Sequence, residues 1–454
     1  MGESISSSFP QQTLRWLRAL SPERLCILVF LLVFSFRLFL TLAVTRDFVS
    51  EECEVDLIAR SLATGGVFGN GYRGPTGPTS HAAPGYPFLL SIIYSIIGMG
   101  VTAEVVKQVL CTAVVAASYA LLPIFSSYAG NGTLPGLAAG LIGLLPLKLN
   151  LETKCGDGEP LYALILIGIS LITLQAWSNQ KLNLSHAVMQ GLIWGVALLF
   201  APPFLVILFG FAIVEFFLVF NRERKRYVQG LVVRFIIIAT LLMPWTIRNY
   251  QQFGTLVFIR GNLGLELASA NNETSALDLF SNNETRVAKQ IHPNLSDEAV
   301  AEVRRIGEPA YFHQMRNRAL EWMSSHPTET ARRSVLRFLL FWFPIPLREI
   351  GPKPIIRSAI ACILTLAAFM GFFRLWRRGY RAAPMITAIW VMFPIVYYFV
   401  VHDPRYRYPI EWTINFCASY LLIEALSRLP FGAVAGSHGV AREADPKGMT
   451  PVDG

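Results

Sequence analysis

Four acidic side chains lie within six residues, directly after the first long apolar run of the chain. They are Glu51, Glu52, Glu54 and Asp56. A positioned carboxylate can accept the proton of an alcohol and so activate a weak nucleophile. The same residues would also suit the first turn of a solvated helix, because acidic side chains are stabilised at helix N-termini. The sequence therefore allows two interpretations of this cluster, a general base and a helix start.

A second group of acids occupies the segment NLETKCGDGEP, residues 150–160. Within it, Asp157 and Glu159 are candidate ligands for a divalent metal, because hard cations take carboxylate oxygens. Both acids could instead cap the helix expected to begin near Pro160. No cofactor is certain from the sequence, and metal binding at these two residues is one of two interpretations.

Arginines occur where apolar runs begin or end. The stretch HDPRYRYP, residues 402–409, holds Arg405 and Arg407, and the stretch PWTIRNY, residues 244–250, holds Arg248. A guanidinium binds phosphate through two parallel hydrogen bonds. These arginines are therefore candidates for holding a lipid-borne phosphate. The alternative is ordinary anchoring of the helix ends at a membrane surface by Arg and Tyr.

The elements that must position these residues are membrane-spanning helices. The chain has 454 residues, of which 53% are hydrophobic and 15% charged, whereas soluble domains carry about 25% charge. Apolar runs of about 20 residues can cross a bilayer as helix, which satisfies every backbone polar group internally. The spans expected are roughly 25–46, 104–127, 133–149, 160–177, 187–201, 204–220, 230–246, 355–373, 383–401 and 409–427.

Basic loops give the expected orientation of these spans. The loops at 221–227 and 374–381 are rich in Lys and Arg, which predicts that both face the cytoplasm. The apolar segment 86–98 is too short to span and is expected to lie in or re-enter the interface. The basic and aromatic stretch 332–343 is likewise expected to be an interfacial helix. The net charge of +9 is attributed to this topology and to lipid electrostatics, so no nucleic-acid partner is expected.

Several polar residues raise separate expectations. Arg37 lies in the middle of the first span without an obvious local partner, whereas Glu215 and Arg234 lie at similar depth in consecutive spans and are expected to form a structural ion pair. Cys53 and Cys155 lie beside the two acid clusters. A disulfide between them is expected if both clusters line one cavity in an oxidising compartment.

The predicted organisation has five parts. They are a cytoplasmic tail at 1–24, an N-terminal transmembrane module at 25–246 with a catalytic outer loop at 47–103, a periplasmic segment with an interfacial helix at 247–354, C-terminal transmembrane helices at 355–427, and a disordered cytoplasmic tail at 428–454.

The first outer loop carries a family resemblance. Acids directly after the first span, then ARSLATGG, then GPTS-x-x-x-PGYP, resemble the first periplasmic loop of bacterial GT-C glycosyltransferases. This group includes relatives of protein O-mannosyltransferases and of the lipid A aminoarabinose transferase. The later stretches TIRNYQQFGTLVFIRGNLGLEL, HPNLSDEAVAEVRRIGEPAYF and RYRYPIEW resemble the same group, and the similarity runs from about residue 25 to 427.

This resemblance implies an all-α polytopic membrane protein, a GT-C-like helical bundle with interfacial helices and a periplasmic soluble segment. It implies a multi-pass enzyme of the inner (plasma) membrane with its active site on the periplasmic side. The activity implied is inverting transfer of a hexosyl or pentosyl group from a polyprenyl-phosphate donor to a hydroxyl of an envelope glycan, lipid or protein. By the family pattern the base falls on Glu51 or Glu54, and Glu54 is preferred.

The sequence departs from the family pattern at two places. Its acids are Glu where many relatives have Asp, and Ala82 occupies the position of a lysine found in aminoarabinose-transferase-like members. His81 or the arginines would then supply the missing positive charge. A transporter or flippase of lipid-linked sugars is the alternative function. That class commonly contains internal repeats, and none is evident here.

Overall fold

A computed structural model describes residues 20–44, 53–145, 158–179, 184–219, 224–347 and 351–428. The ordered elements in these ranges are helices, apart from two isolated β-bridges. Most of the two predicted tails, together with Glu51, Cys155 and Asp157, lies outside the described residues.

Every predicted span falls on a helix or on a pair of consecutive helices. The bundle consists of α2 (Pro22–Val44), α5 (Val101–Ala120) followed by α6 (Leu122–Tyr128), α7 (Leu134–Leu141), α9 (Glu159–Asn179), α10 (Leu184–Phe200), α11 (Phe204–Val219), α12 (Arg224–Phe253), α19 (Pro352–Arg377), α20 (Ala382–Met392) and α21 (Glu411–Ser427). Short 3₁₀ turns adjoin three of these helices. Turn η1 (Ile142–Leu144) follows α7, η2 (Phe393–Tyr398) follows α20, and η3 (Pro404–Ile410) precedes α21. Five of the described helices are long and apolar enough to cross a membrane by themselves, and five more are apolar but shorter.

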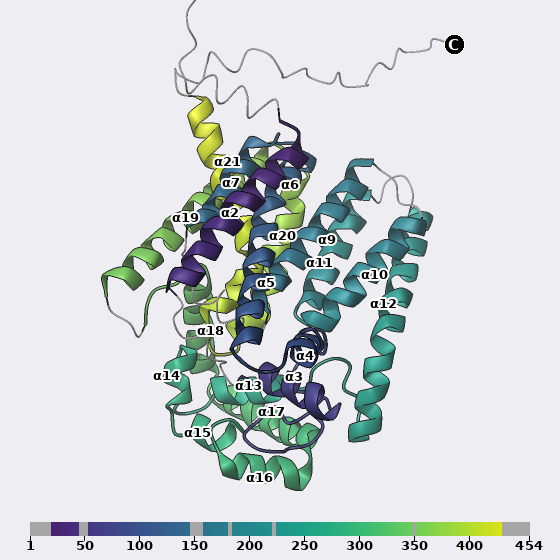
Figure 1. The fold of residues 1–454 in the computed structure, drawn as a ribbon, viewed down its shortest axis with the longest axis vertical. Coiled ribbons are helices and arrows are strands. Elements are labelled where there is room, and N and C mark those ends of the chain that lie inside the picture. The colour runs from purple at the N-terminus through teal and green to yellow at the C-terminus, as the bar shows by residue number, and fades with distance from the viewer. Residues whose placement is uncertain are drawn as a thin grey trace, which may run out of the picture.

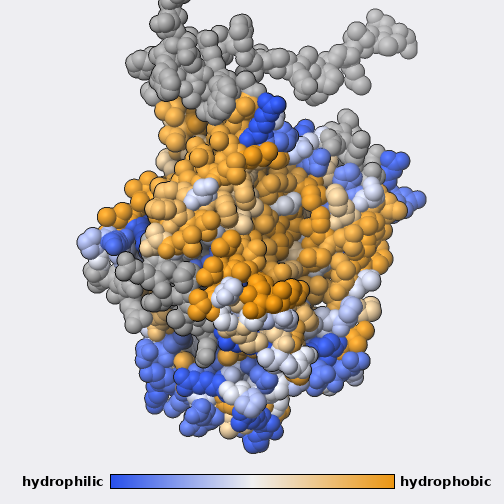
Figure 2. Space-filling view, viewed as in Figure 1, coloured by the Kyte–Doolittle hydropathy of each residue, from blue (hydrophilic) through white to orange (hydrophobic). Residues whose placement is uncertain are grey.

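The surface of the bundle is apolar, as a lipid-facing surface must be. Figure 2 shows hydrophobic residues covering most of the bundle, whereas hydrophilic residues predominate at the lower end of the molecule. Side chains such as Phe39 and Phe217 are largely exposed. Helices approach closely through small residues, since a Cβ added to Gly371 of α19 would lie 2.0 Å from the Cys417 carbonyl oxygen of α21. An all-α polytopic membrane fold follows from these features.

Charged side chains inside the bundle have protein partners. The guanidinium of Arg234 lies 2.8 Å from the Glu215 carboxylate, and both side chains are buried, which confirms the predicted ion pair. Arg37 is also buried. Its guanidinium donates to the carbonyl oxygens of Gly143, at 2.6 Å, and Leu145, at 3.1 Å. Its partners are carbonyls left open where a distant helical turn ends, so no local sequence pattern could indicate them.

A layer of short helices closes one end of the bundle. We call it the cap. It contains α13 (Leu263–Ala270), α14 (Leu279–Asn283), α15 (Ala288–Ile291), α16 (Asp297–Ile306) and α17 (Glu308–Ser325). Figure 1 shows the cap at the bottom, with the start of α2 and the end of α21 at the opposite end of the bundle. The cap has its own apolar core, which includes Phe312 and also Tyr72 from the first loop.

Three further helices lie between the bundle and the cap: α3 (Glu54–Gly65), α4 (Gly85–Ile97) and α18 (Pro327–Trp342). With 13 residues, α4 spans about 20 Å, which is short of a bilayer core of about 30 Å. One of its faces is apolar and exposed, and the other buries Tyr86, Leu90 and Tyr94. A short apolar helix therefore lies at the segment 86–98, which the sequence predicts to be too short to span. Its expected place in the membrane interface stays a prediction.

Helix α18 buries two of its three arginines, Arg333 and Arg337, while Arg332 is exposed. Arg337 is fully buried and donates to the carbonyl oxygens of Ala270, at 2.5 Å, and Phe399, at 3.2 Å. Val335 and Phe338 are exposed instead. The two buried arginines therefore join α18 to neighbouring segments of the cap and the bundle, and exposed apolar side chains occupy its outer face.

Candidate functional site

Glu54 stands at the first turn of α3, where the first loop meets the cap. Its Oε1 accepts a hydrogen bond from the side-chain amide of Asn294 at 2.6 Å, and the His292 ring nitrogen Nε2 lies 3.9 Å away. The Glu54 side chain keeps 22% of its surface exposed. Its carboxylate is therefore oriented by a neutral amide while part of it stays accessible.

The other candidate base, Glu51, lies outside the described residues. The preference for Glu54 over Glu51 remains a prediction. Cys155 lies outside them too, so the Cys53–Cys155 disulfide also stays a prediction.

Asp56, two residues after Glu54 on α3, is held by a buried charge network. Its Oδ2 lies 2.6 Å from the Arg60 guanidinium, and its Oδ1 lies 3.3 Å from the Lys107 ammonium and accepts a hydrogen bond from the Tyr94 hydroxyl. Lys107 also reaches Glu104, at 3.0 Å. Because a buried carboxylate needs paired charges, this network fixes α3 against α4 and α5.

Sequence reasoning missed this network, although one signal was present. A lysine does lie beside the acids of the first loop, but it is Lys107 from α5 and comes from a different position than Ala82. A charged residue near the start of an apolar span is a candidate by default. Applied to Lys107, that rule would have drawn attention to it, but not to Asp56 as its partner.

Glu308, the first residue of α17, clamps the first loop onto the cap. Its carboxylate accepts hydrogen bonds from the Thr79 hydroxyl at 2.5 Å, the Ser80 amide at 2.5 Å and the Ser80 hydroxyl at 2.8 Å. The Tyr72 hydroxyl donates to it as well, at 3.2 Å. Burial raises the pKa of Glu308 more than these four donors lower it. No sequence motif indicated this contact.

His81 lies within the same clamp. It is buried, and its Nδ1 is 3.0 Å from the Tyr72 hydroxyl. Burial lowers the pKa of His81 well below its usual value, and the nearby charges of Arg260 and His292 lower it further. The ring is therefore neutral at neutral pH and does not carry the positive charge expected of it. A donor-binding role for His81 remains a prediction.

Arg248 anchors the clamp to the bundle. Its guanidinium donates to the carbonyl oxygens of Thr79, at 2.9 Å, and Phe68, at 2.6 Å. It also lies against the rings of Phe68 and Trp245. Its hydrogen bonds hold the first loop in place, and its expected contact with phosphate stays untested.

Arg405 and Arg407 differ in their availability. Arg407 is buried and donates to the Trp342 carbonyl oxygen at 2.7 Å and to Glu411 at 3.1 Å. Arg405 is 25% exposed and forms longer ion pairs, 3.4 Å to Asp403 and 3.7 Å to Glu159. Of these two arginines, Arg405 is the more exposed, and its contact with a ligand stays a prediction.

Glu159 thus has an arginine beside it. Among the described residues, no group of three or more His, Cys, Asp or Glu side chains comes together as a metal centre would require. Asp157, the second candidate ligand, lies outside them. A divalent metal at Asp157 and Glu159 therefore stays a prediction.

Charged and polar neighbours connect Arg405 with the Glu54 side of the cap. Arg405 and Glu266 both act electrostatically on Tyr406, Glu266 lies 4.0 Å from Arg260, and Arg260 acts in turn on His81. The Arg260–Glu266 pair therefore lies within electrostatic range of both His81 and Tyr406, the neighbour of Arg405.

Comparison with known proteins gives a fold but no close relative. No family model and no curated protein matches the sequence. Among solved structures, the archaeal oligosaccharyltransferase AglB from Archaeoglobus fulgidus, determined in complex with an inhibitory peptide and a dolichol-phosphate, aligns with a TM-score of 0.55 and 14% identity. The alignment covers 92% of this chain and 52% of AglB, so this chain spans about half the length of that protein. The protein therefore has a GT-C-like membrane fold, and the bacterial subtype expected from its motifs stays a prediction.

Proposed function

We propose that this protein is a membrane glycosyltransferase. It transfers a sugar from a polyprenyl-phosphate donor to a hydroxyl group of an envelope glycan, lipid or protein, with inversion at the sugar carbon. Support comes from the GT-C-like fold and from AglB, which was determined with a dolichol-phosphate and a peptide. The donor, the acceptor and the location in the inner membrane are parts of this proposal.

The observation that carries the proposal is the placement of Glu54. Its carboxylate is partly exposed between bundle and cap, and the side-chain amide of Asn294 orients it. As a general base it accepts the proton of the acceptor hydroxyl as the oxygen attacks the sugar carbon. The carbon–oxygen bond to the donor phosphate breaks in the same displacement. A single displacement inverts the configuration at that carbon.

Arg405 has the complementary role in this mechanism. Negative charge grows on the departing polyprenyl phosphate, and a guanidinium stabilises it with charge-assisted hydrogen bonds. The phosphate is a good leaving group, so no general acid is needed. Arg248 and Arg407 act as positioning residues here, because their donors already hold the first loop and η3.

A transporter or flippase has no comparable support. That function requires charged groups lining a path through the bundle. In the described spans, Arg37, Glu215 and Arg234 are buried and bonded to protein groups.

Mass analysis of cell-envelope glycans tests the activity. We expect cells without the protein to lack one glycan, lipid or glycoprotein species that differs from its precursor by the mass of one sugar. Wild-type protein should restore the species, and so should Glu284→Gln, which removes a solvent-exposed acid of the cap. The double variant Glu51→Gln/Glu54→Gln should not. Restoration by the double variant, or no mass change on deletion, would contradict the proposal.

The outward orientation of the cap needs its own test. With the six native cysteines replaced, a cysteine at Glu284 should react with an impermeant maleimide added outside intact cells, because long translocated segments follow the spans rather than their own charge. Reaction only after permeabilisation would place the cap, and the proposed site, on the cytoplasmic side.

A further inference from the structure

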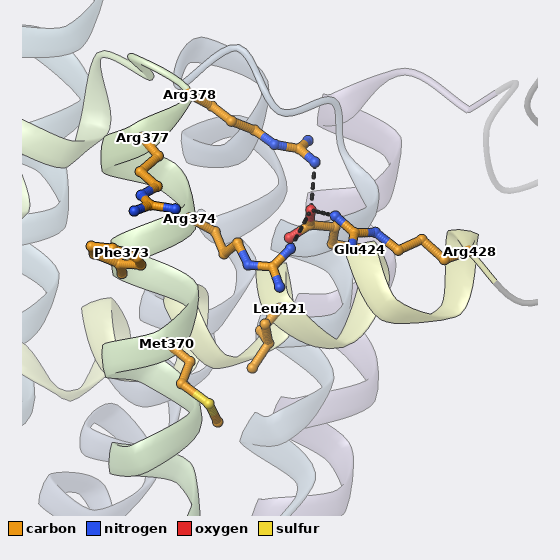
Figure 3. Close-up of a pocket in the computed structure, with 8 residues that line it drawn as sticks. All are labelled: Met370, Phe373, Arg374, Arg377, Arg378, Leu421, Glu424 and Arg428. Carbon is orange, nitrogen blue, oxygen red and sulfur yellow. Dashed lines mark hydrogen bonds and ion pairs between the residues drawn. The ribbon is translucent and has the colours of Figure 1, made fainter.

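The end of the bundle opposite the cap contains a basic hollow between α19 and α21. It has a volume of about 540 Å³ and is lined by Met370, Phe373, Arg374, Arg377, Arg378, Leu421, Glu424 and Arg428. Figure 3 shows three of the four arginines converging on Glu424 and Arg377 standing apart from it, beside Phe373. Four arginines against one carboxylate leave a net charge of +3 in the lining.

These arginines retain donors for a ligand. The guanidinium groups of Arg374, Arg378 and Arg428 all contact the same oxygen of Glu424, the first at 3.2 Å and the last at 2.5 Å. Each guanidinium has five N–H donors, so one shared carboxylate oxygen leaves most of them unused. The three side chains are between 43% and 57% exposed. The single carboxylate thus arranges the arginines without saturating them.

Arg377 is the most available member of the group. Its guanidinium lies 4.5 Å from the centre of the Phe373 ring, and it is exposed. Among the described residues it forms none of the ion pairs that its three neighbours form with Glu424. A guanidinium held flat against a ring keeps its edge donors free for an anion.

An apolar stripe runs from the hollow along α19. Ile363, Leu366, Met370 and Phe373 recur every three or four residues, and each is more than half exposed. That spacing places them on one face of the helix. Three of the four arginines, Arg374, Arg377 and Arg378, follow at the C-terminal end of α19, where the helix dipole also favours positive charge. The apolar stripe suits an acyl chain, and the arginines at its end suit a phosphate, so the two together are complementary to one phospholipid molecule.

We propose that this hollow binds an anionic phospholipid, with its phosphate among the four arginines and an acyl chain along the α19 stripe. A free phosphate ion would use the arginines but not the stripe. The site is separate from the region between bundle and cap, so the inference does not depend on the glycosyltransferase proposal.

Native mass spectrometry of the purified full-length protein tests the site. The probes are phosphatidylglycerol and phosphatidylcholine with identical acyl chains, titrated separately. We expect one phosphatidylglycerol to bind at a concentration about tenfold below that needed for phosphatidylcholine, the scale of one charge-assisted hydrogen bond. Equal binding of the two lipids would overturn the proposal.

The informative variant is Arg377→Gln. It removes a donor without unpairing Glu424, so the fold should be kept, which thermal unfolding in detergent checks. We expect about tenfold weaker phosphatidylglycerol binding, with a smaller loss for Arg377→Lys, which keeps the charge but not the planar fork. The matched control is Arg24→Gln, which removes an exposed arginine from the start of α2 at the same end of the bundle. If Arg377→Gln and Arg24→Gln weaken phosphatidylglycerol binding equally, the lipid is attracted by general surface charge and the proposed site is wrong.

Competition separates a lipid from a free anion. Inorganic phosphate at millimolar concentration should leave phosphatidylglycerol bound, because it makes no contact with the apolar stripe. If millimolar phosphate displaces the lipid, the site recognises an anion without an acyl chain, and the proposal is wrong.

Discussion

Glu54 and Asp56 are two residues apart on α3 and meet different surroundings. The Asp56 side chain is 3% exposed and contacts Arg60, Lys107 and Tyr94. The Glu54 side chain is 22% exposed and accepts from the neutral amide of Asn294. One carboxylate is thus enclosed by cations and a phenol, while the other is oriented and still accessible.

This difference separates a structural acid from a candidate base. Asp56 is buried, and its two oxygens are held by Arg60, Lys107 and Tyr94, so it is out of reach of an acceptor. Glu54 is oriented by the Asn294 amide and keeps part of its surface exposed. The geometry therefore favours Glu54 as the proton acceptor and Asp56 as the residue that holds α3 in position. Two predictions test this division, and two more extend it to the arginines and to Glu308, from the largest expected effect to the smallest.

Glu54→Gln should lower the rate of sugar transfer by about 10²- to 10⁴-fold, the usual contribution of general acid–base catalysis. The amide keeps the shape of the side chain but cannot accept the proton. The measurement is incorporation of labelled sugar from the polyprenyl-phosphate donor by protein of unchanged thermal stability. If only Glu51→Gln abolished transfer, the base would be Glu51 and the comparison would fail.

Asp56→Asn should reduce stability by about 3 kcal/mol, because it leaves two cations beside a group without charge, Lys107 being buried. The loss is at the lower end of the usual range since Glu104 still pairs with Lys107. Thermal unfolding in detergent measures the change. Transfer per folded molecule should change far less than for Glu54→Gln. A stable Asp56→Asn protein without activity would instead make Asp56 the base.

Arg405→Ala should raise the donor concentration needed for half-maximal transfer about tenfold, through loss of a charge-assisted hydrogen bond to phosphate. Arg407→Ala serves as the contrast. It leaves the buried Trp342 carbonyl oxygen without its 2.7 Å donor, so its main effect should be on thermal stability. An unchanged donor dependence in Arg405→Ala would assign that arginine to anchoring at the membrane surface.

The smallest effect is a pH dependence of stability at Glu308. Burial raises its pKa in the folded protein above the usual value of 4.5, so the folded state binds the proton more tightly than the unfolded state. The stabilising contribution is complete below pH 4.5 and is lost as pH rises through the raised folded pKa. Relative to Glu308→Gln, the wild-type unfolding free energy should fall across that window by no more than about 1.4 kcal/mol per pH unit. A rise would mean that the four donors outweigh burial.

Much of the fold was determined locally and could be predicted from the sequence. Apolar runs of sufficient length gave each bundle helix, Pro202-Pro203 separated α10 from α11, and the short apolar run gave α4. These features follow from chain length and hydropathy, which a bilayer selects without reference to the rest of the protein. The Glu215–Arg234 pair was equally predictable, since both residues lie at the same depth of consecutive spans.

The state of each candidate site residue was decided only by the tertiary structure. Lys107 reaches Asp56 across 51 positions of sequence, and Asn294 reaches Glu54 across 240. Arg405 and Arg407 look alike in the sequence, yet Arg407 is buried and donates to the Trp342 carbonyl oxygen, whereas the Arg405 side chain is 25% exposed. Burial and neighbouring charge determine whether an ionisable group is structural or available. Both arise from packing between distant segments, so spacing along the chain could nominate these residues but could not rank them.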